Sequence, residues 1–159
     1  MTTQTLIRST PRRVTTYAVA ALLAFSLGIG GLARSADAAV PTANQLMFSY
    51  SLSSFLTVKA AHPAPYNWSD DGCSAKIFSS VVNAYFNDQC KRHDFGYRNW
   101  RRITGYSGTS SLRLAIDNKL YSDMKDRCSH FSIFNPLRGI CYDVADAAYV
   151  AVHVGGSLN

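Results

Sequence analysis

The chain has 159 residues, of which 47% are hydrophobic and 16% are charged. This length suits a single domain, and the composition excludes an intrinsically disordered chain because it supplies enough apolar side chains for a core. The formal net charge is +6, with 16 basic residues against 10 acidic ones.

Residues 1–38 are expected to form a secretion signal peptide. A basic start precedes an uncharged, mostly apolar run over residues 17–32; its arginines are Arg8, Arg12 and Arg13. The run is short for a membrane span, and the small residues that follow it resemble a signal-peptidase site. A membrane anchor is the alternative. We expect cleavage after Ala38 and an extracellular mature domain over residues 39–159.

Removing the leader changes the charge. Four basic residues and Asp37 leave with it, so the mature domain keeps 12 basic against 9 acidic residues, a net charge of +3. A charge this small does not argue for a nucleic-acid partner. It is compatible with attraction to anionic surfaces, including phospholipid headgroups.

The predicted mature domain contains all four cysteines of the chain, Cys73, Cys90, Cys128 and Cys141. An even number in a small exported domain predicts two disulfides. Three pairings exist, and the spacing favours neighbours, Cys73 with Cys90 and Cys128 with Cys141. A zinc site is the alternative, which the absence of a Cys-x-x-Cys pair disfavours.

Helical periodicity recurs in four segments, at about residues 43–59, 81–102, 110–128 and 140–154. Pro63 and Pro65 follow the first segment, Ser110 is a candidate N-cap for the third, and Gly155 follows the fourth. No segment shows a convincing period of two. The sequence therefore predicts a small, all-α, disulfide-stapled domain.

Two polar residues of the second segment lie on its apolar face. On a helical wheel His93 and Asp94 share the face of Cys90, whereas Arg92 and Arg98 fall outside it. Burying a histidine and a carboxylate is costly unless each has a partner. A core histidine and a surface Asp94–Arg98 pair are the alternative, but together the two residues favour a functional site.

The third segment repeats this pattern with Asp117, which lies in the middle of its apolar arc. A side chain this short cannot reach water from a buried position. The alternative is an Arg113–Asp117 pair on a half-exposed helix.

A disulfide between Cys73 and Cys90 would bring the loop over residues 69–72 beside the helical turn that holds His93. Asp71 and Asp94 would then converge, and two carboxylates repel each other unless a cation lies between them. Oxygen ligands from carboxylates and loop carbonyls suit Ca²⁺.

The stretch from Cys90 to Asn99, CKRHDFGYRN, resembles the active-site helix of secreted phospholipases A2, most closely their bacterial and fungal branch. Residues 68–73 resemble that branch's calcium loop, and residues 116–128 resemble its second active-site helix. The resemblance implies an all-α fold with two antiparallel active-site helices.

The resemblance also implies residue roles. His93 would be the general base, and Asp117 would hold its imidazole ring. Asp71 and Asp94 would bind Ca²⁺ through carboxylates, and Gly72 through its backbone carbonyl. The implied activity is calcium-dependent hydrolysis of the sn-2 ester of glycerophospholipids, by a secreted monomer acting at a phospholipid membrane or micelle, with no nucleic acid involved.

Some features leave alternatives open. Gly72 stands where the branch often has a larger residue, and its backbone freedom would loosen the site. A catalytically silent membrane- or protein-binding module and a metal-dependent nuclease are the rival functions. Tyr97 is expected to pack around the site. Two apolar groups are candidates for contact with lipid, residues 131–137 and residues 77–82.

Overall fold

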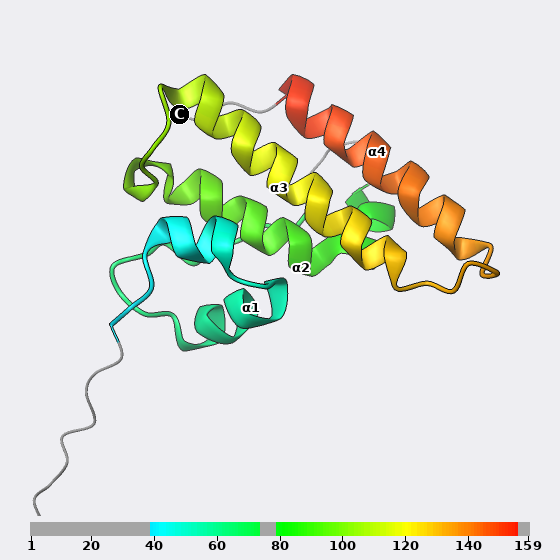
Figure 1. Cartoon of the computed structure of the whole chain (residues 1–159), viewed down its shortest axis with the longest axis horizontal. Coiled ribbons are helices and arrows are strands. Elements are labelled where there is room, and N and C mark those ends of the chain that lie inside the picture. Colours follow the sequence, from blue (N-terminus) through cyan, green and yellow to red (C-terminus); the bar gives the residue numbers. More distant parts are fainter. Residues whose placement is uncertain (1–38, 74–78, 156–159) are drawn as a thin grey trace, which may run out of the picture. The chain divides into compact units, whose positions relative to one another are not determined.

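The computed structural model describes residues 39–73 and 79–155 (Figure 1). Within these ranges every element is helical, which confirms the all-α prediction. The elements are η1 (Gln45–Ser49, a π-helix), α1 (Leu52–Ala61), α2 (Ser79–Arg98), η2 (Trp100–Arg102, a 3₁₀-helix), α3 (Thr109–Ser129) and α4 (Leu137–Gly155). None of these helices is long and apolar enough to cross a membrane. The predicted signal peptide lies outside the described residues.

The first predicted helix is divided into two, so the expectation of one continuous helix over residues 43–59 was wrong. Tyr50 is extended, with ψ 144°, and ends η1. Ser51 is the N-cap of α1, and its hydroxyl oxygen accepts a hydrogen bond from the backbone N–H of Ser54 at 3.1 Å. Capping satisfies one of the unpaired N–H groups at a helix start, so this serine begins a new helix.

The other helices lie close to their predicted positions. α2 ends at Arg98, before the predicted end at residue 102, because Asn99 leaves helical geometry and η2 follows. α3 begins at Thr109 with Gly108 as its N-cap, so Ser110 is not the cap. α2 also bends at Phe86, where φ is −132° and ψ is 21°.

Figure 1 shows α2 and α3 side by side and antiparallel, with α4 against α3. Both predicted disulfides are present. Cys73–Cys90 joins the loop before α2 to α2, with Cα atoms 5.3 Å apart. Cys128–Cys141 joins the end of α3 to α4, with Cα atoms 5.6 Å apart. The chain's four cysteines are thus all paired.

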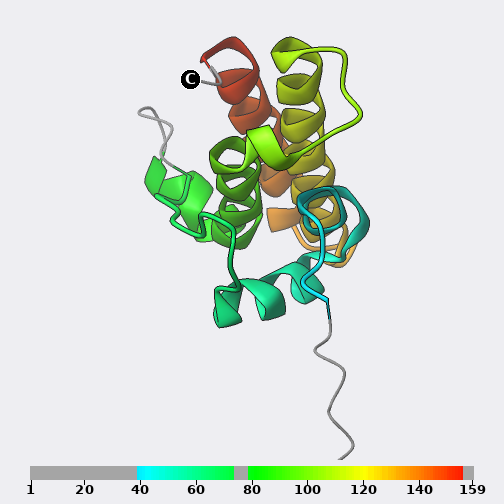
Figure 2. The same ribbon diagram turned by 90° about the vertical axis from the view of Figure 1, so that its left-hand side faces the viewer.

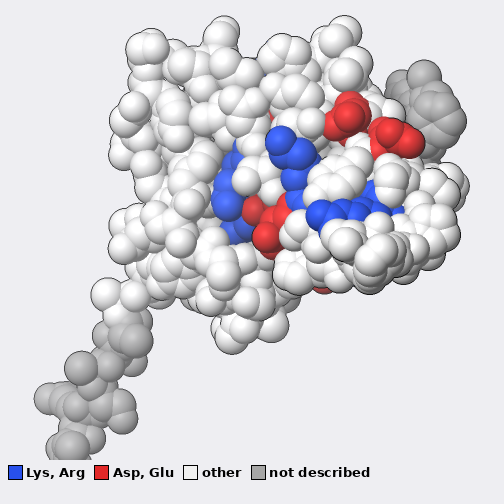
Figure 3. All heavy atoms as spheres, turned by 45° about the vertical axis from the view of Figure 1, so that its right-hand side comes forward, with Lys and Arg blue, Asp and Glu red and all other residues white. Residues whose placement is uncertain are grey.

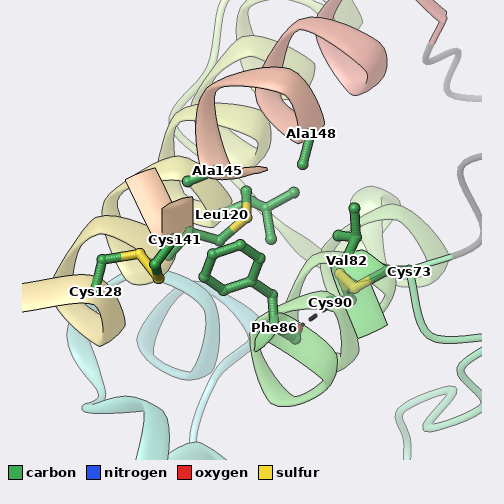
Figure 4. Packing of buried hydrophobic residues seen from close by; sticks show 10 residues of the cluster. Cys73, Val82, Phe86, Cys90, Leu120, Cys128, Cys141, Ala145 and Ala148 are labelled. Atoms are coloured by element: carbon green, nitrogen blue, oxygen red, sulfur yellow. Dashed lines mark hydrogen bonds between the residues drawn. A yellow bond between two sulfur atoms is a disulfide. The ribbon is translucent and has the colours of Figure 1, made fainter. Parts of the chain in front are cut away.

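Two buried clusters hold the helices together. One lies between α2, α3 and α4 and includes Phe86, Leu120 and Met124 (Figure 4). The other joins η1 and α1 to α2 and α3 through residues such as Met47, Phe55, Trp68, Phe95 and Ile116. Each buried side chain of this size contributes about 1.5–3 kcal/mol of apolar transfer energy.

Close packing in the second cluster depends on Gly96 of α2. A Cβ atom at this position would lie 2.9 Å from the sulfur of Met47 and 3.0 Å from Ile116. Glycine therefore lets η1 and α3 approach α2 closely, one turn after His93. This approach sets the spacing between the two helices that carry the predicted catalytic residues.

Candidate active site

The structure brings His93 of α2 and Asp117 of α3 together. His93 Nε2 lies 2.9 Å from Asp117 Oδ1. The His93 side chain is 13% exposed, whereas that of Asp117 is completely buried. The histidine can therefore meet a small molecule from solvent while its partner carboxylate is shielded from water.

This contact determines which imidazole nitrogen is available. A carboxylate oxygen only accepts, so Nε2 of His93 donates to Asp117. In the neutral ring Nδ1 is then unprotonated and able to accept a proton. The arrangement can perform general-base chemistry at Nδ1.

Tyr97 is a member of this cluster that the sequence analysis treated as packing only. Its hydroxyl donates a hydrogen bond to the same Oδ1 of Asp117 at 2.9 Å, and its ring lies against that of His93, with centroids 4.6 Å apart. Burial, together with the hydrogen bond to Asp117, raises the pKa of Tyr97. Tyr97 follows His93 by four residues, so the shared helix face was a usable signal.

The alternative of a half-exposed Arg113–Asp117 pair is correct for the pairing, which is formed at 4.0 Å, but not for the exposure, because the Asp117 carboxylate is fully buried. Oδ2 of Asp117 accepts no hydrogen bond within the described part of the chain. Arg113 Nε lies 4.0 Å from it, and Arg113 Nη2 donates to the backbone carbonyl of His153. Burying this charge is costly, and the donors His93 and Tyr97 offset part of that cost.

The second predicted group also converges. The backbone N–H of Asp71 donates to Oδ2 of Asp94 at 3.0 Å, which places the loop against α2. Burial raises the pKa of Asp94 to about 7, and the neighbouring Asp71 carboxylate adds to the increase. Oδ1 of Asp71 accepts from Arg98 Nη2 at 3.2 Å. Arg98 thus pairs with the loop and not with Asp94, so the alternative Asp94–Arg98 surface pair is not formed.

Asn83 of α2 and Asn99, the residue directly after α2, hold this loop at both ends. The buried amide of Asn99 accepts from the backbone N–H of Asn67 at 2.9 Å and donates to the Asn67 carbonyl at 2.8 Å. Near the disulfide, Asn83 Oδ1 accepts from the backbone N–H of Cys73 at 2.8 Å. The loop backbone is thereby fixed at one end by α2 and at the other by the residue that links α2 to η2.

Gly72 has a specific role in this loop. Its φ is +66°, a left-handed conformation that L side chains rarely adopt, and an added Cβ would lie 2.8 Å from Asn83 Oδ1. Where the sequence suggests that glycine loosens the site, the structure shows a position at which glycine is needed.

The chemistry of this group suits a hard cation. Asp71 and Asp94 supply carboxylate oxygens, and Gly72, the residue after Asp71, supplies a backbone carbonyl oxygen. No cluster of three or more His, Cys, Asp or Glu side chains with metal-binding geometry occurs in residues 39–73 and 79–155. Ca²⁺ takes backbone carbonyls and water as well as carboxylates, so two acidic side chains fit its requirements better than those of zinc.

Arg92 is a buried residue that the helical wheel placed outside the apolar face. It is 1% exposed, its Nε donates to Asp123 Oδ2 at 2.9 Å, and Nη1 donates to the Tyr50 carbonyl at 2.7 Å. The segment containing η1 and α1 covers this side of α2. Periodicity within α2 gives no signal of that cover, which is why the prediction for Arg92 was wrong.

The two apolar groups proposed for lipid contact differ in exposure. In the loop between α3 and α4, Phe134 is 89% exposed and Ile133 is 73% exposed. Val82 of the other group is buried, and residues 77 and 78 lie outside the described residues.

The chain is similar to known proteins over most of its length. Residues 43–156 match the family described as prokaryotic phospholipase A2. A secretory phospholipase A2 of Arthroderma benhamiae is 33% identical over 140 residues, which cover 82% of this chain and 92% of that protein. A secretory phospholipase A2 of Beauveria bassiana is 31% identical over 116 residues, which cover 72% of this chain and 57% of that protein. The chain belongs to the prokaryotic phospholipase A2 family.

Proposed function

We propose that this protein is a secreted, calcium-dependent phospholipase A2 that hydrolyses the sn-2 ester of glycerophospholipids with a water molecule activated by His93. The observation that carries the proposal is the hydrogen bond between His93 Nε2 and the buried Asp117 carboxylate. In a chain of this family, that pair supplies an oriented base beside two convergent aspartates.

The catalytic steps use His93 as both base and acid. Nδ1 takes a proton from water while the water oxygen attacks the ester carbonyl carbon. The imidazolium that forms is stabilised by the Asp117 carboxylate, which also fixes the tautomer. The same proton then passes to the leaving alkoxide oxygen, which gives a free fatty acid and a lysophospholipid. Proton transfer of this kind contributes about 10²–10⁴-fold to a rate.

Asp71, Asp94 and the Gly72 carbonyl would hold Ca²⁺. A bound calcium ion supplies positive charge for the ester carbonyl oxygen, on which negative charge develops during attack. Arg98, which pairs with Asp71, would have to share or release that carboxylate. The hydrogen bonds that Asn99 and Asn83 accept from the loop backbone support the proposal, since they fix the loop before any cation binds.

Water is the proposed nucleophile, so no acyl-enzyme forms. All four cysteines are in disulfides and cannot act as nucleophiles. Two disulfides also suit an oxidising, extracellular environment. We therefore include export in the proposal, with residues 1–38 as the signal peptide and residues 39–159 as the catalytic domain.

The test is fatty-acid release from phosphatidylcholine vesicles that carry a label on the sn-2 chain, with Ca²⁺ and then with excess EGTA. We expect calcium-dependent release of the labelled chain, which His93→Ala abolishes. His130→Ala is the matched control, because His130 is exposed at the end of α3. Absence of release from folded, disulfide-bonded protein would favour a catalytically silent binding module.

A further inference from the structure

In the segment over residues 95–116, beside the candidate active site, all charged residues are basic. Between Asp94 and Asp117 the sequence contains four arginines and no acidic residue. Three of the four, Arg98, Arg101 and Arg102, lie at the end of α2 and in η2 together with Trp100. We call Arg98, Trp100, Arg101 and Arg102 the arginine corner. Figure 2 views the molecule from this end, with η2 in front.

Two of these arginines differ from most basic side chains of the protein. Each of four others pairs with an aspartate: Lys59, Lys91, Arg92 and Lys119. On the face in Figure 3 basic and acidic side chains also lie next to each other. Arg101 and Arg102 are exposed and have no carboxylate within 4.0 Å among the described residues; Arg101 instead lies over the Trp100 ring, 5.1 Å from its centroid. Their charge is available to a partner.

The surface is hollowed at this corner. The arginine corner and Asn99 line an open cavity of about 510 Å³. A second hollow of about 330 Å³ adjoins it and shares Trp100 and Arg101. Guanidinium groups that surround a hollow suit phosphate oxygens, which they bind through paired N–H donors.

The corner is continuous with the candidate active site. Arg98 donates to the Asp71 carboxylate, and Asn99, between Arg98 and Trp100, holds the backbone of Asn67 in the same loop. A phosphate surface that meets the corner would therefore also meet the site. By contrast, the exposed apolar loop after α3 lies at the other end of a 21-residue helix, which is about 30 Å long.

We propose that the arginine corner docks the enzyme on anionic phospholipid membranes. The inference rests on the proposed function, since a phospholipase meets its substrate at a lipid surface. Arg101 and Arg102 bind lipid phosphates, and Trp100 lies at the level of the headgroups, where tryptophan is enriched at membrane interfaces. The partner is a bilayer, because two adjoining hollows and an aromatic ring match an extended surface better than one free phosphate.

The test compares two double variants with the same change in net charge. Arg101→Gln/Arg102→Gln alters the corner, and Lys125→Gln/Arg127→Gln alters exposed basic residues near the far end of α3. Binding to vesicles of phosphatidylcholine with phosphatidylglycerol is measured by sedimentation in EGTA, so that no hydrolysis is needed. We expect the corner variant to lose about 30-fold in affinity, which is about fivefold per arginine, and the control to lose much less.

Trp100 provides a second, spectroscopic readout. Trp68 is 6% exposed and already shielded from water, whereas Trp100 is only partly buried. A shift of tryptophan emission to shorter wavelength on mixing with anionic vesicles is expected, and Trp100→Phe should abolish it.

Three results would overturn the docking proposal. They are equal losses in the two double variants, a larger loss in Lys125→Gln/Arg127→Gln, and equal binding of wild-type protein to vesicles with and without phosphatidylglycerol. A free phosphate site would instead appear as competition by millimolar inorganic phosphate, beyond that of sulfate at equal ionic strength, and would also reject the docking surface. Because binding is measured without calcium, failure of the catalytic proposal would show separately, as absent fatty-acid release.

Discussion

His93 and Asp117 are 24 residues apart in sequence, yet Nε2 of one lies 2.9 Å from Oδ1 of the other. The contact exists because α2 and α3 run antiparallel, and because Gly96 lets the two helices approach. It joins a partly exposed imidazole to a fully buried carboxylate.

Replacing Asp117 with Asn should lower kcat on phospholipid micelles by about 10²-fold or more, with a smaller effect on KM. An amide cannot stabilise the imidazolium of His93 and can hold the wrong tautomer. Initial rates measure the effect, and Asp126→Asn, at an exposed position of the same helix, is the control. A tenfold change in rate corresponds to about 1.4 kcal/mol of activation free energy. A loss of kcat of less than about threefold is well below that and would contradict the role of Asp117.

Tyr97→Phe should keep the ring contact with His93 and remove one hydrogen bond to Asp117. We expect a loss of about 1–2 kcal/mol in the free energy of unfolding, because a buried carboxylate loses a donor. Urea unfolding measures this change. Tyr149→Phe removes a hydrogen bond to Asn118 at an exposed position and should cost less. Equal losses in the two variants would show that the Tyr97 hydroxyl has no special importance.

The stability of calcium-free protein should rise as the pH falls from 8 toward 5. The pKa of Asp94 is about 7 in the folded protein, above its ordinary value of 3.8, so the folded state binds the proton more tightly. Stability is therefore gained as pH falls through 7 and stops increasing below the unfolded value. Thermal unfolding in EGTA at each pH measures the effect.

Asp94→Asn provides the matched comparison for this pH dependence. The variant should be more stable than wild-type protein at pH 8 and should lose most of the dependence, whereas Asp88→Asn, at an exposed position, should retain it. If the free energy of unfolding instead decreased as the pH was lowered from 8 to 6, in both wild-type protein and Asp88→Asn, Asp94 would not have a raised pKa.

Gly72→Ala should weaken cation binding. The new Cβ would meet Asn83 Oδ1 at 2.8 Å, and alanine is strained at a φ of +66°. Both effects move the loop that carries Asp71, so we expect about a tenfold or greater loss of Ca²⁺ affinity by calorimetry. Gly139→Ala is the control, since a Cβ there meets nothing within 4 Å. If Gly72→Ala bound Ca²⁺ with unchanged affinity, the loop would not be part of the calcium site.

Arg92→Met should destabilise the fold by about 3 kcal/mol, because it removes a buried charge from its pair with Asp123. Lys119, 3.0 Å from the other Asp123 oxygen, limits the loss. Adding Asp123→Leu should recover part of the stability, since the buried carboxylate is then gone and only Lys119, which is partly exposed, loses its partner. Denaturant unfolding of the single and double variants tests this coupling, and strictly additive losses would contradict it.

The sequence by itself determined the helical class and the approximate bounds of three of the four predicted helices, and it favoured the cysteine pairing that the structure shows. It also singled out His93, Asp94 and Asp117, because each is a polar residue on an otherwise apolar helix face. Periodicity reports which side of a helix is buried, and a short charged side chain on that side must have a partner.

Tertiary structure decided what those partners are. Tyr97 shares the Asp117 oxygen with His93, Arg98 turns to Asp71 and away from Asp94, and Arg92 is buried beneath the segment containing η1 and α1. A helical wheel of α2 cannot predict that a segment 42 residues away, which contains Tyr50, packs on its polar side. Such contacts depend on how close whole elements approach, which here was set by Gly96 and by the loop that the Cys73–Cys90 disulfide ties to α2.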